Sequence, residues 1–186
     1  MRTRYLYLAL AFAATLAAFD DDDPMLVEEN EEELITRTTV VLTAGTDVVT
    51  FSLVDPDGDG GVDAVTTGGS LAAGTTYSYV ATFLNETEDP AEDITEEVNA
   101  EDEEHQIFIS FDGIDAAVTE QDEDGNGRPL GVTGRIRVAD DASGSGTMNF
   151  TLVHEPNKEA DGVADGDITN AGGETDVAAV FPVTIR

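Results

Sequence analysis

Apolar and polar residues alternate along most of the chain from Leu34 onward, which is the period expected of half-buried β-strands. β-branched residues are abundant in the same segments, and they favour an extended backbone. One face of residues 75–84 carries Tyr77, Tyr79, Ala81 and Phe83. The pattern predicts about eight short strands, at residues 34–42, 48–54, 75–84, 106–111, 116–119, 132–138, 147–154 and 175–185.

One segment has helical character. Asp93 can cap a helix that runs over residues 93–103, and Glu96 stands three positions later, as in a capping box. The segment is acidic and has few apolar positions, so we expect either a short surface helix or only a turn. The Asp- and Gly-rich connection at residues 161–174 predicts a long flexible loop.

The segment from Leu71 to Tyr77 resembles the corner that precedes a core strand in immunoglobulin-like and fibronectin-like sandwiches. In such corners a leucine fills the core and a tyrosine hydroxyl bonds to the backbone upstream. Strand number, turn spacing and this corner predict an all-β fold. We expect an antiparallel immunoglobulin- or fibronectin-like β-sandwich of 7–9 strands, formed as one domain by residues 34–186.

The charge of the chain is strongly unbalanced, with 40 acidic and 8 basic residues and a formal net charge of −32. Such a surface repels itself in dilute buffer, but at about 1 M salt the screening length falls to about 3 Å. The composition therefore predicts a salty environment, typical of a halophile. It argues against nucleic acid and anionic lipid as partners, and it favours cations.

The N-terminus has the pattern of an export signal. Residues 1–19 combine Arg2 and Arg4 with an apolar run that is too short for a comfortable membrane span. Phe19 stands where a bacterial lipoprotein has its lipidated cysteine, and the chain contains no cysteine. Cleavage at this point and retention as an uncleaved anchor both remain open. Residues 20–33 are dominated by Asp and Glu and predict an extended acidic tether between the domain and a membrane.

Two loops share the spacing D-x-[DN]-x-[DN]-G, in which oxygen side chains converge on one point and glycine permits a sharp turn. The candidate calcium ligands are Asp55, Asp57 and Asp59 in the first loop, and Asp122, Asp124 and Asn126 in the second. The glutamate that completes an EF-hand is absent, because Thr66 and Thr133 occupy its position. The alternative is that both loops are ordinary hairpin turns in an acidic chain.

The chain has only two histidines, His105 and His154, each at one end of a predicted strand and next to a glutamate. If those strands are neighbours, the two imidazoles and a carboxylate would suit Zn²⁺ or Cu²⁺. The alternative is two unrelated surface histidines. Neither a nucleophile elbow nor a zincin helix nor a glycine-rich phosphate loop occurs, so the sequence favours a protein that is not an enzyme.

Several segments resemble an uncharacterised family of small envelope lipoproteins of the Bacteroidota, sometimes labelled type 1 periplasmic-binding-fold proteins. The resemblance spans residues 31–186. It is specific only when taken over several segments together, namely 31–36, 84–86, 93–97, 104–106, 122–131, 154–158, 166–170, 172–176 and 181–183. Members usually carry a cysteine at the position of Phe19. The resemblance implies a cell-envelope location and no particular activity, and the α/β fold in the label conflicts with the strands predicted here.

These observations favour an exported, envelope-associated binding module that is not an enzyme, with acidic loops that hold calcium. Two alternatives remain open. One is a periplasmic or surface protein that captures zinc or copper with His105 and His154, and the other is a structural or adhesive module without a ligand.

Overall fold

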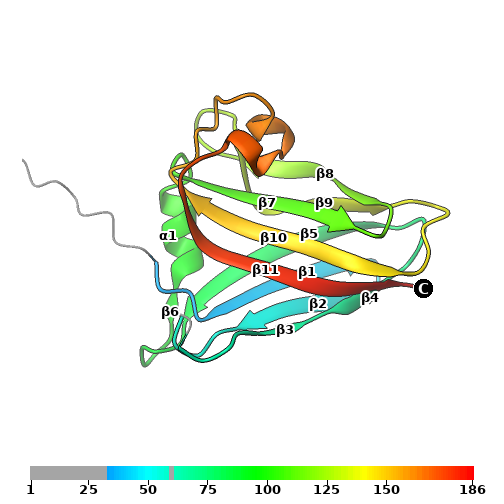
Figure 1. Ribbon diagram of the computed structural model, residues 1–186, viewed down its shortest axis with the longest axis horizontal. Helices are drawn as coiled ribbons and strands as arrows, with labels where there is room; N and C mark the ends of the chain where they lie inside the picture. Colours follow the sequence, from blue (N-terminus) through cyan, green and yellow to red (C-terminus); the bar gives the residue numbers. More distant parts are fainter. Residues whose placement is uncertain (1–32, 59–60) are drawn as a thin grey trace, which may run out of the picture. The chain divides into compact units, whose positions relative to one another are not determined.

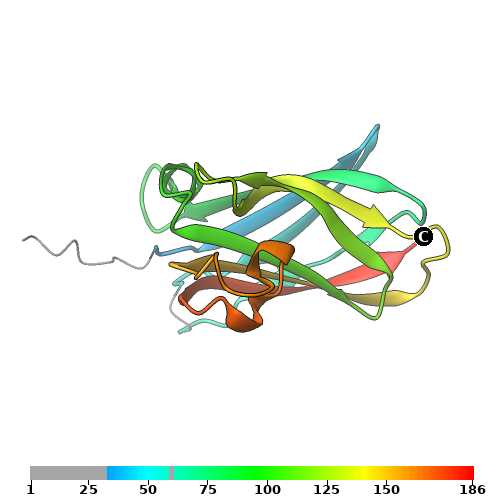
Figure 2. The same ribbon diagram turned by 90° about the horizontal axis from the view of Figure 1, so that it is seen from above.

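The structure, a computed structural model, describes residues 33–58 and 61–186. These residues form a sandwich of two β-sheets, and Figures 1 and 2 show its two layers from perpendicular directions. The predicted all-β sandwich is therefore confirmed. The predicted leader at residues 1–19 and residues 20–32 of the predicted tether lie outside the described residues.

The larger sheet is antiparallel, and β6 (Glu92–Asp93) pairs with one of its central strands, β5. Its spatial order is β3 (Val65–Thr67), β2 (Asp47–Val54), β1 (Arg37–Ala44), β5 (Thr76–Asn85), β9 (Pro129–Val138) and β8 (Ala116–Glu123). The second sheet has the order β4 (Gly69–Leu71), β11 (Glu174–Ile185), β10 (Ser145–His154) and β7 (His105–Asp112). Only the short β4 runs parallel to its neighbour, β11.

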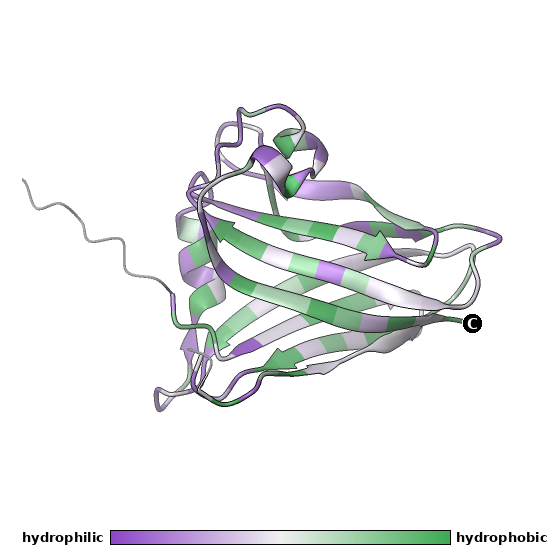
Figure 3. Ribbon diagram, in the orientation of Figure 1, coloured by the Kyte–Doolittle hydropathy of each residue, from purple (hydrophilic) through white to green (hydrophobic). Residues whose placement is uncertain are grey.

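Alternation along the strands produces the core between the two sheets. In β5 the buried apolar positions are those predicted from the sequence, Tyr77, Tyr79, Ala81 and Phe83. Rings from the two layers meet there, since the centroids of Phe51 and Phe181 are 5.8 Å apart and those of Phe83 and Phe150 are 6.1 Å apart. Figure 3 shows the same alternation as bands of hydrophobic and polar colour along the strands.

The predicted tyrosine corner is present. The hydroxyl of Tyr77 accepts a hydrogen bond from the backbone N–H of Ala72 at 2.9 Å and donates one to Asp47 at 2.6 Å. Leu71 and Tyr77 are fully buried. The corner thus joins the segment before β5, which leads from β4 of the second sheet, to the first residue of β2.

The predicted helix is shorter than its sequence pattern suggests. α1 (Ile94–Ala100) begins after Asp93, whose carboxylate accepts from the N–H of Thr95, and it buries Ile94 and Val98 against the sandwich. Figure 1 places α1 across the end of the sandwich where β7 begins and β10 ends. No helix in the described part of the chain is long and apolar enough to cross a membrane.

The connection between β10 and β11 is more ordered than a flexible loop. It contains two 3₁₀ turns, Val163–Asp165 and Ile168–Asn170, and it buries Val163 and Ala171 beside Phe108 and Val153. The side chain of Gln106 donates to the carbonyl oxygen of Val163 at 2.9 Å. The composition suggested mobility because polar and glycine residues predominate, but a few apolar contacts are enough to fold the segment onto β7.

We predict that Tyr77→Phe lowers the free energy of unfolding by about 1–3 kcal/mol, because the N–H of Ala72 would lose its partner in a buried corner. Urea unfolding at high salt measures this change, with an unaltered denaturant slope as the sign that the fold is retained. A variant as stable as the parent protein would show that the corner bond contributes nothing.

Candidate metal centre

The two histidines lie side by side at one end of the sandwich. His105 is the first residue of β7 and His154 the last residue of β10, and the antiparallel register pairs them directly. Both side chains belong to the inward-facing rows of their strands. His105 stands two residues before the buried Ile107 in β7, and His154 stands two residues after the buried Leu152 in β10. Their rings stack with centroids 4.6 Å apart and planes 21° apart. The sequence predicted a shared metal site only if the strands that carry the two histidines are neighbours, and β7 and β10 are neighbours.

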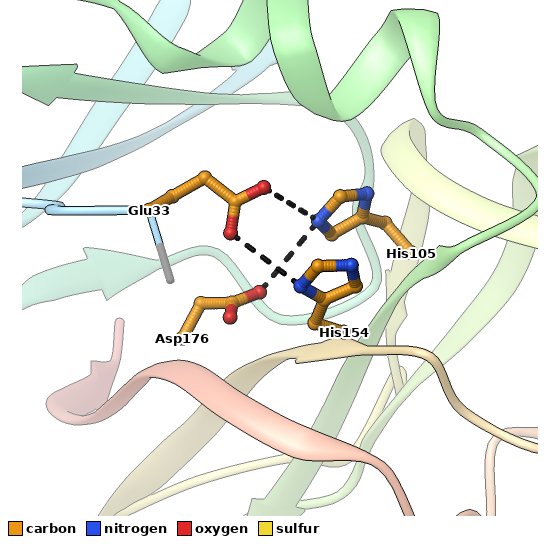
Figure 4. Close-up of side chains that lie close together, drawn as sticks. All are labelled: Glu33, His105, His154 and Asp176. Atoms are coloured by element: carbon orange, nitrogen blue, oxygen red, sulfur yellow. Dashed lines mark ion pairs between the residues drawn. The ribbon is translucent and has the colours of Figure 1, made fainter. Parts of the chain in front are cut away.

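Two carboxylates complete the cluster, and Figure 4 shows all four side chains converging. Nε2 of His105 lies 3.2 Å from Oε1 of Glu33 and 3.8 Å from Oδ2 of Asp176, and Nδ1 of His154 lies 3.8 Å from Oε2 of Glu33. Each of the four residues offers one ligand atom, and these atoms all lie within 4.8 Å of one another. We call Glu33, His105, His154 and Asp176 the inner cluster.

A β-bulge brings Asp176 into the inner cluster. The register between β10 and β11 pairs Leu152 with Val177 but Val153 with Thr175, so Asp176 is the extra residue. Strict alternation would direct it away from the core side that Val177 occupies. The bulge re-aims it, and its side chain is only 1% exposed. Gly173 lets the preceding loop approach closely, since a Cβ there would lie 2.2 Å from the carbonyl oxygen of His154.

Glu33 comes from the segment that precedes β1. The charge pattern assigns this residue to the extended tether, yet its side chain is only 6% exposed and faces both imidazole rings. The backbone just after it is fixed to the larger sheet, because the N–H of Thr36 donates to Leu84 and the Thr36 hydroxyl accepts from the N–H of Glu86. The chain is therefore fixed to the end of β5 three residues after Glu33, just before β1 begins.

The helix end selects the orientation of the His105 ring. Nδ1 of His105 lies 3.1 Å from the carbonyl oxygen of Glu101, which caps the C-terminus of α1. A ring that donates from Nδ1 presents the lone pair of Nε2 to the inner cluster, which is the arrangement of metal-bound histidines whose second nitrogen is held by a backbone carbonyl.

The inner cluster contains buried polar atoms without hydrogen bonds. Among the described residues, Glu33 Oε2, His105 Nε2 and His154 Nδ1 have no hydrogen-bond partner. The 3.2 Å contact between His105 and Glu33 is an ion pair that lacks the alignment of a hydrogen bond. Each unsatisfied buried polar group costs about 1–3 kcal/mol. A bound cation would supply a partner for all three atoms at once.

The charges of the cluster shift two pKa values. Burial of its ring alone lowers the pKa of His105, but the Glu33 carboxylate, the Glu101 carbonyl and Asp176 outweigh it, so this pKa is raised. Burial raises the pKa of Glu33, but contact with His105 and the charge of His154 outweigh that effect and lower it. Without a metal, the protonated His105 and the ionised Glu33 stabilise each other.

The carboxylates of the second acidic loop accept hydrogen bonds from backbone N–H groups and from Lys158. Oδ1 of Asp122 accepts from the N–H groups of Gly131 and Thr133. Oδ1 of Asp124 accepts from the N–H groups of Asn126 and Arg128, and Oδ2 accepts from Nζ of Lys158 at 2.8 Å. The ammonium of Lys158, the only lysine in the chain, thus stands beside the carboxylate proposed to hold calcium.

The first acidic loop is described only in part. Oδ1 of Asp55 accepts a hydrogen bond from the N–H of Gly58, as in an ordinary turn, and Asp57 lies within that turn. The third candidate ligand, Asp59, lies outside the described residues. Two groups of three or more His, Asp or Glu residues come together in the described part of the chain, and neither includes a residue of the acidic loops. Calcium binding there stays a prediction.

Comparisons with models of protein families, with curated proteins and with solved structures found no match for this chain.

We predict that the inner cluster gives the metal-free protein a distinctive pH dependence. The raised pKa of His105 means that its contribution to stability is complete below about pH 6.5 and is lost as pH rises through its folded-state pKa. The lowered pKa of Glu33 means that its contribution is complete above about pH 4.5 and is lost on acidification. The stability difference between the parent protein and His105→Gln should therefore be largest between these values.

Urea unfolding of both proteins in chelator and high salt, from pH 4 to 9, measures that difference. Subtracting the variant removes the general effect of the acidic surface, which both proteins share. A difference that is constant across this range would contradict the coupling of His105 to Glu33.

The buried pair Lys158–Asp124 generates a second prediction. Lys158→Met should destabilise the protein by about 3–5 kcal/mol, because the Asp124 side chain, only 1% exposed, would lose its cation. Arg128→Met is the control, since it breaks the more exposed pair with Glu159 and should cost about 1 kcal/mol or less. Equal effects of the two substitutions in urea unfolding would refute a special role for Lys158.

Proposed function

We propose that this protein captures a divalent transition-metal ion, Zn²⁺ or Cu²⁺, with Glu33, His105, His154 and Asp176. The observation that carries the proposal is the convergence of two imidazole nitrogens and two carboxylates, nearly all of it buried, with three polar atoms that have no hydrogen bond. Imidazole is a ligand for zinc and copper, whereas calcium prefers six to eight oxygen atoms.

The distances within the inner cluster fit such an ion. Two ligand atoms bound at about 2.0–2.1 Å to one tetrahedral ion lie about 3.3 Å apart. The ion-pair distances of 3.2–3.8 Å are close to that separation before any adjustment. The two carboxylates also neutralise a divalent cation when both imidazoles are neutral, which removes the cost of burying uncompensated charge.

The ligand number favours capture over catalysis. Structural zinc sites are closed by four protein ligands, whereas catalytic zinc sites keep one position open for water or substrate. The inner cluster offers four ligands, and their side chains are 0–6% exposed. We therefore propose a metal-holding protein that is not an enzyme.

The composition supports a location where such a protein would meet dilute cations. The pattern of residues 1–19 and the resemblance to envelope lipoproteins favour export to the periplasm or the cell surface. A net charge of −32 raises the local concentration of cations and repels nucleic acid. In the salty surroundings that this charge suggests, screening weakens general attraction, so that specific coordination has to provide the affinity.

We predict that zinc stabilises the protein against thermal unfolding, by about 2.7 kcal/mol when free zinc reaches 100 times its Kd. Calorimetry in 1 M NaCl with excess Mg²⁺ measures the effect and suppresses weak binding to surface carboxylates. His105→Ala or Glu33→Gln should raise the zinc Kd by about 100-fold or more, since each removes a ligand.

Glu88→Gln is the matched control for Glu33→Gln, because it removes the same charge from an exposed position that lies outside both metal-ligand groups. It should leave zinc affinity unchanged. The proposal fails if zinc does not raise the melting temperature, or if the control variant loses as much affinity as Glu33→Gln.

A further inference from the structure

His154 is placed between two sets of carboxylates. Its Nδ1 faces Glu33 in the inner cluster, and its Nε2 lies 3.8 Å from Oε2 of Glu104 on the opposite side. Figure 4 shows that each imidazole directs one nitrogen toward the carboxylates of the inner cluster and the other away from them. The residue is 4% exposed, and Nδ1 has no hydrogen-bond partner among the described residues.

The second set of carboxylates lies in the turn that joins α1 to β7. Glu101 caps the helix, and the N–H of Glu104 donates to the Glu101 carbonyl oxygen at 2.9 Å, which fixes the turn. The N–H of Glu155 donates to the carbonyl oxygen of Glu104 at 2.6 Å, so the same turn is joined to the residue after His154. Ligand atoms of Glu101, Glu104 and His154 lie within 4.8 Å of one another.

Lys158 also holds this turn in place. Its ammonium donates to the carbonyl oxygen of Asp102 at 2.6 Å while it pairs with Asp124. The turn that carries Glu101 and Glu104 is thus held by hydrogen bonds from two residues of the loop after β10, Glu155 and Lys158. It presents two exposed carboxylates toward a nearly buried imidazole nitrogen.

We propose that Glu101, Glu104 and Nε2 of His154 form a second position for a divalent transition metal, so that His154 bridges two ions. The proposal rests on the proposed function of the inner cluster. It supplies a role for both nitrogens of His154, whereas a single inner ion uses only one. When both nitrogens bind metal, the remaining ring proton passes to solvent.

The two positions differ in accessibility and therefore in expected affinity. The inner cluster has four nearly buried ligands, whereas the outer position has three, and the Glu104 side chain is 58% exposed. Water completes the coordination of an outer ion. We expect the outer ion to bind more weakly than the inner one and to exchange faster.

Zinc titration with counting of bound equivalents tests the inference. The protein is equilibrated with zinc in 1 M NaCl and excess Mg²⁺, and bound zinc is measured by elemental analysis. The parent protein should bind two equivalents, and Glu101→Gln/Glu104→Gln should bind one with unchanged tight affinity. Glu88→Gln/Glu96→Gln removes the same charge from exposed positions outside both metal-ligand groups and should keep two.

Copper provides a signature of the bridge itself. Two Cu²⁺ ions that share one imidazole ring couple magnetically, so the EPR intensity per bound copper should be reduced in the doubly loaded parent protein. Full intensity should return in Glu101→Gln/Glu104→Gln, in which the inner ion remains.

The outcomes separate this inference from the proposed function. One zinc equivalent that is lost in His105→Ala but unaffected by Glu101→Gln/Glu104→Gln would overturn the second position alone. A second equivalent that persists in Glu101→Gln/Glu104→Gln, or full copper intensity at double loading, would also overturn it. Absence of any bound zinc in the parent protein would defeat the proposed function itself.

Discussion

The burial of two carboxylates beside two imidazole rings is the constraint on which this end of the molecule depends. The inward-facing residues of β7 and β10 are mostly apolar, as hydrophobic packing requires. At this end of the sandwich, however, the inward-facing residue of each strand is a histidine, His105 in β7 and His154 in β10. Charged and polar groups with few partners are costly to bury. Glu33, His105 and His154 each bury a polar atom that has no hydrogen bond. A cation bound between them would coordinate these atoms and so offset the free-energy cost of burying them.

The fold places these residues by ordinary means. Antiparallel register pairs the two histidines, a bulge inserts Asp176, and the backbone of Thr36, bonded to β5, fixes the chain three residues after Glu33. The carbonyl at the end of α1 orients His105, and the turn after that helix carries Glu101 and Glu104. Ligands from the N-terminal segment and from three strands of one sheet therefore meet at one point. We infer that metal binding would also join the segment before β1 to the second sheet.

The sequence predicted the eight longer strands, the tyrosine corner and the two candidate histidines, because alternation and rare residue types are local properties. It missed β3, β4 and β6, which have only two or three residues each and are too short to show alternation. It could not establish that β7 and β10 are neighbours, since strand order is decided by the packing of the whole chain. Glu33 was hidden in a run of acidic residues, and Asp176 depends on a bulge that no local pattern marks. The regular spacing of the acidic loops predicted calcium ligands, whereas in the structure Asp122 and Asp124 accept hydrogen bonds from backbone N–H groups and Lys158.

X-ray absorption spectroscopy of the protein loaded with one equivalent of zinc tests the central claim most directly. The inner cluster predicts four nitrogen or oxygen neighbours at about 2.0–2.1 Å. It also predicts outer-shell scattering from two imidazole rings, because the chain has no other histidines. A shell of six oxygen atoms without imidazole scattering would place the zinc on surface carboxylates and contradict the account.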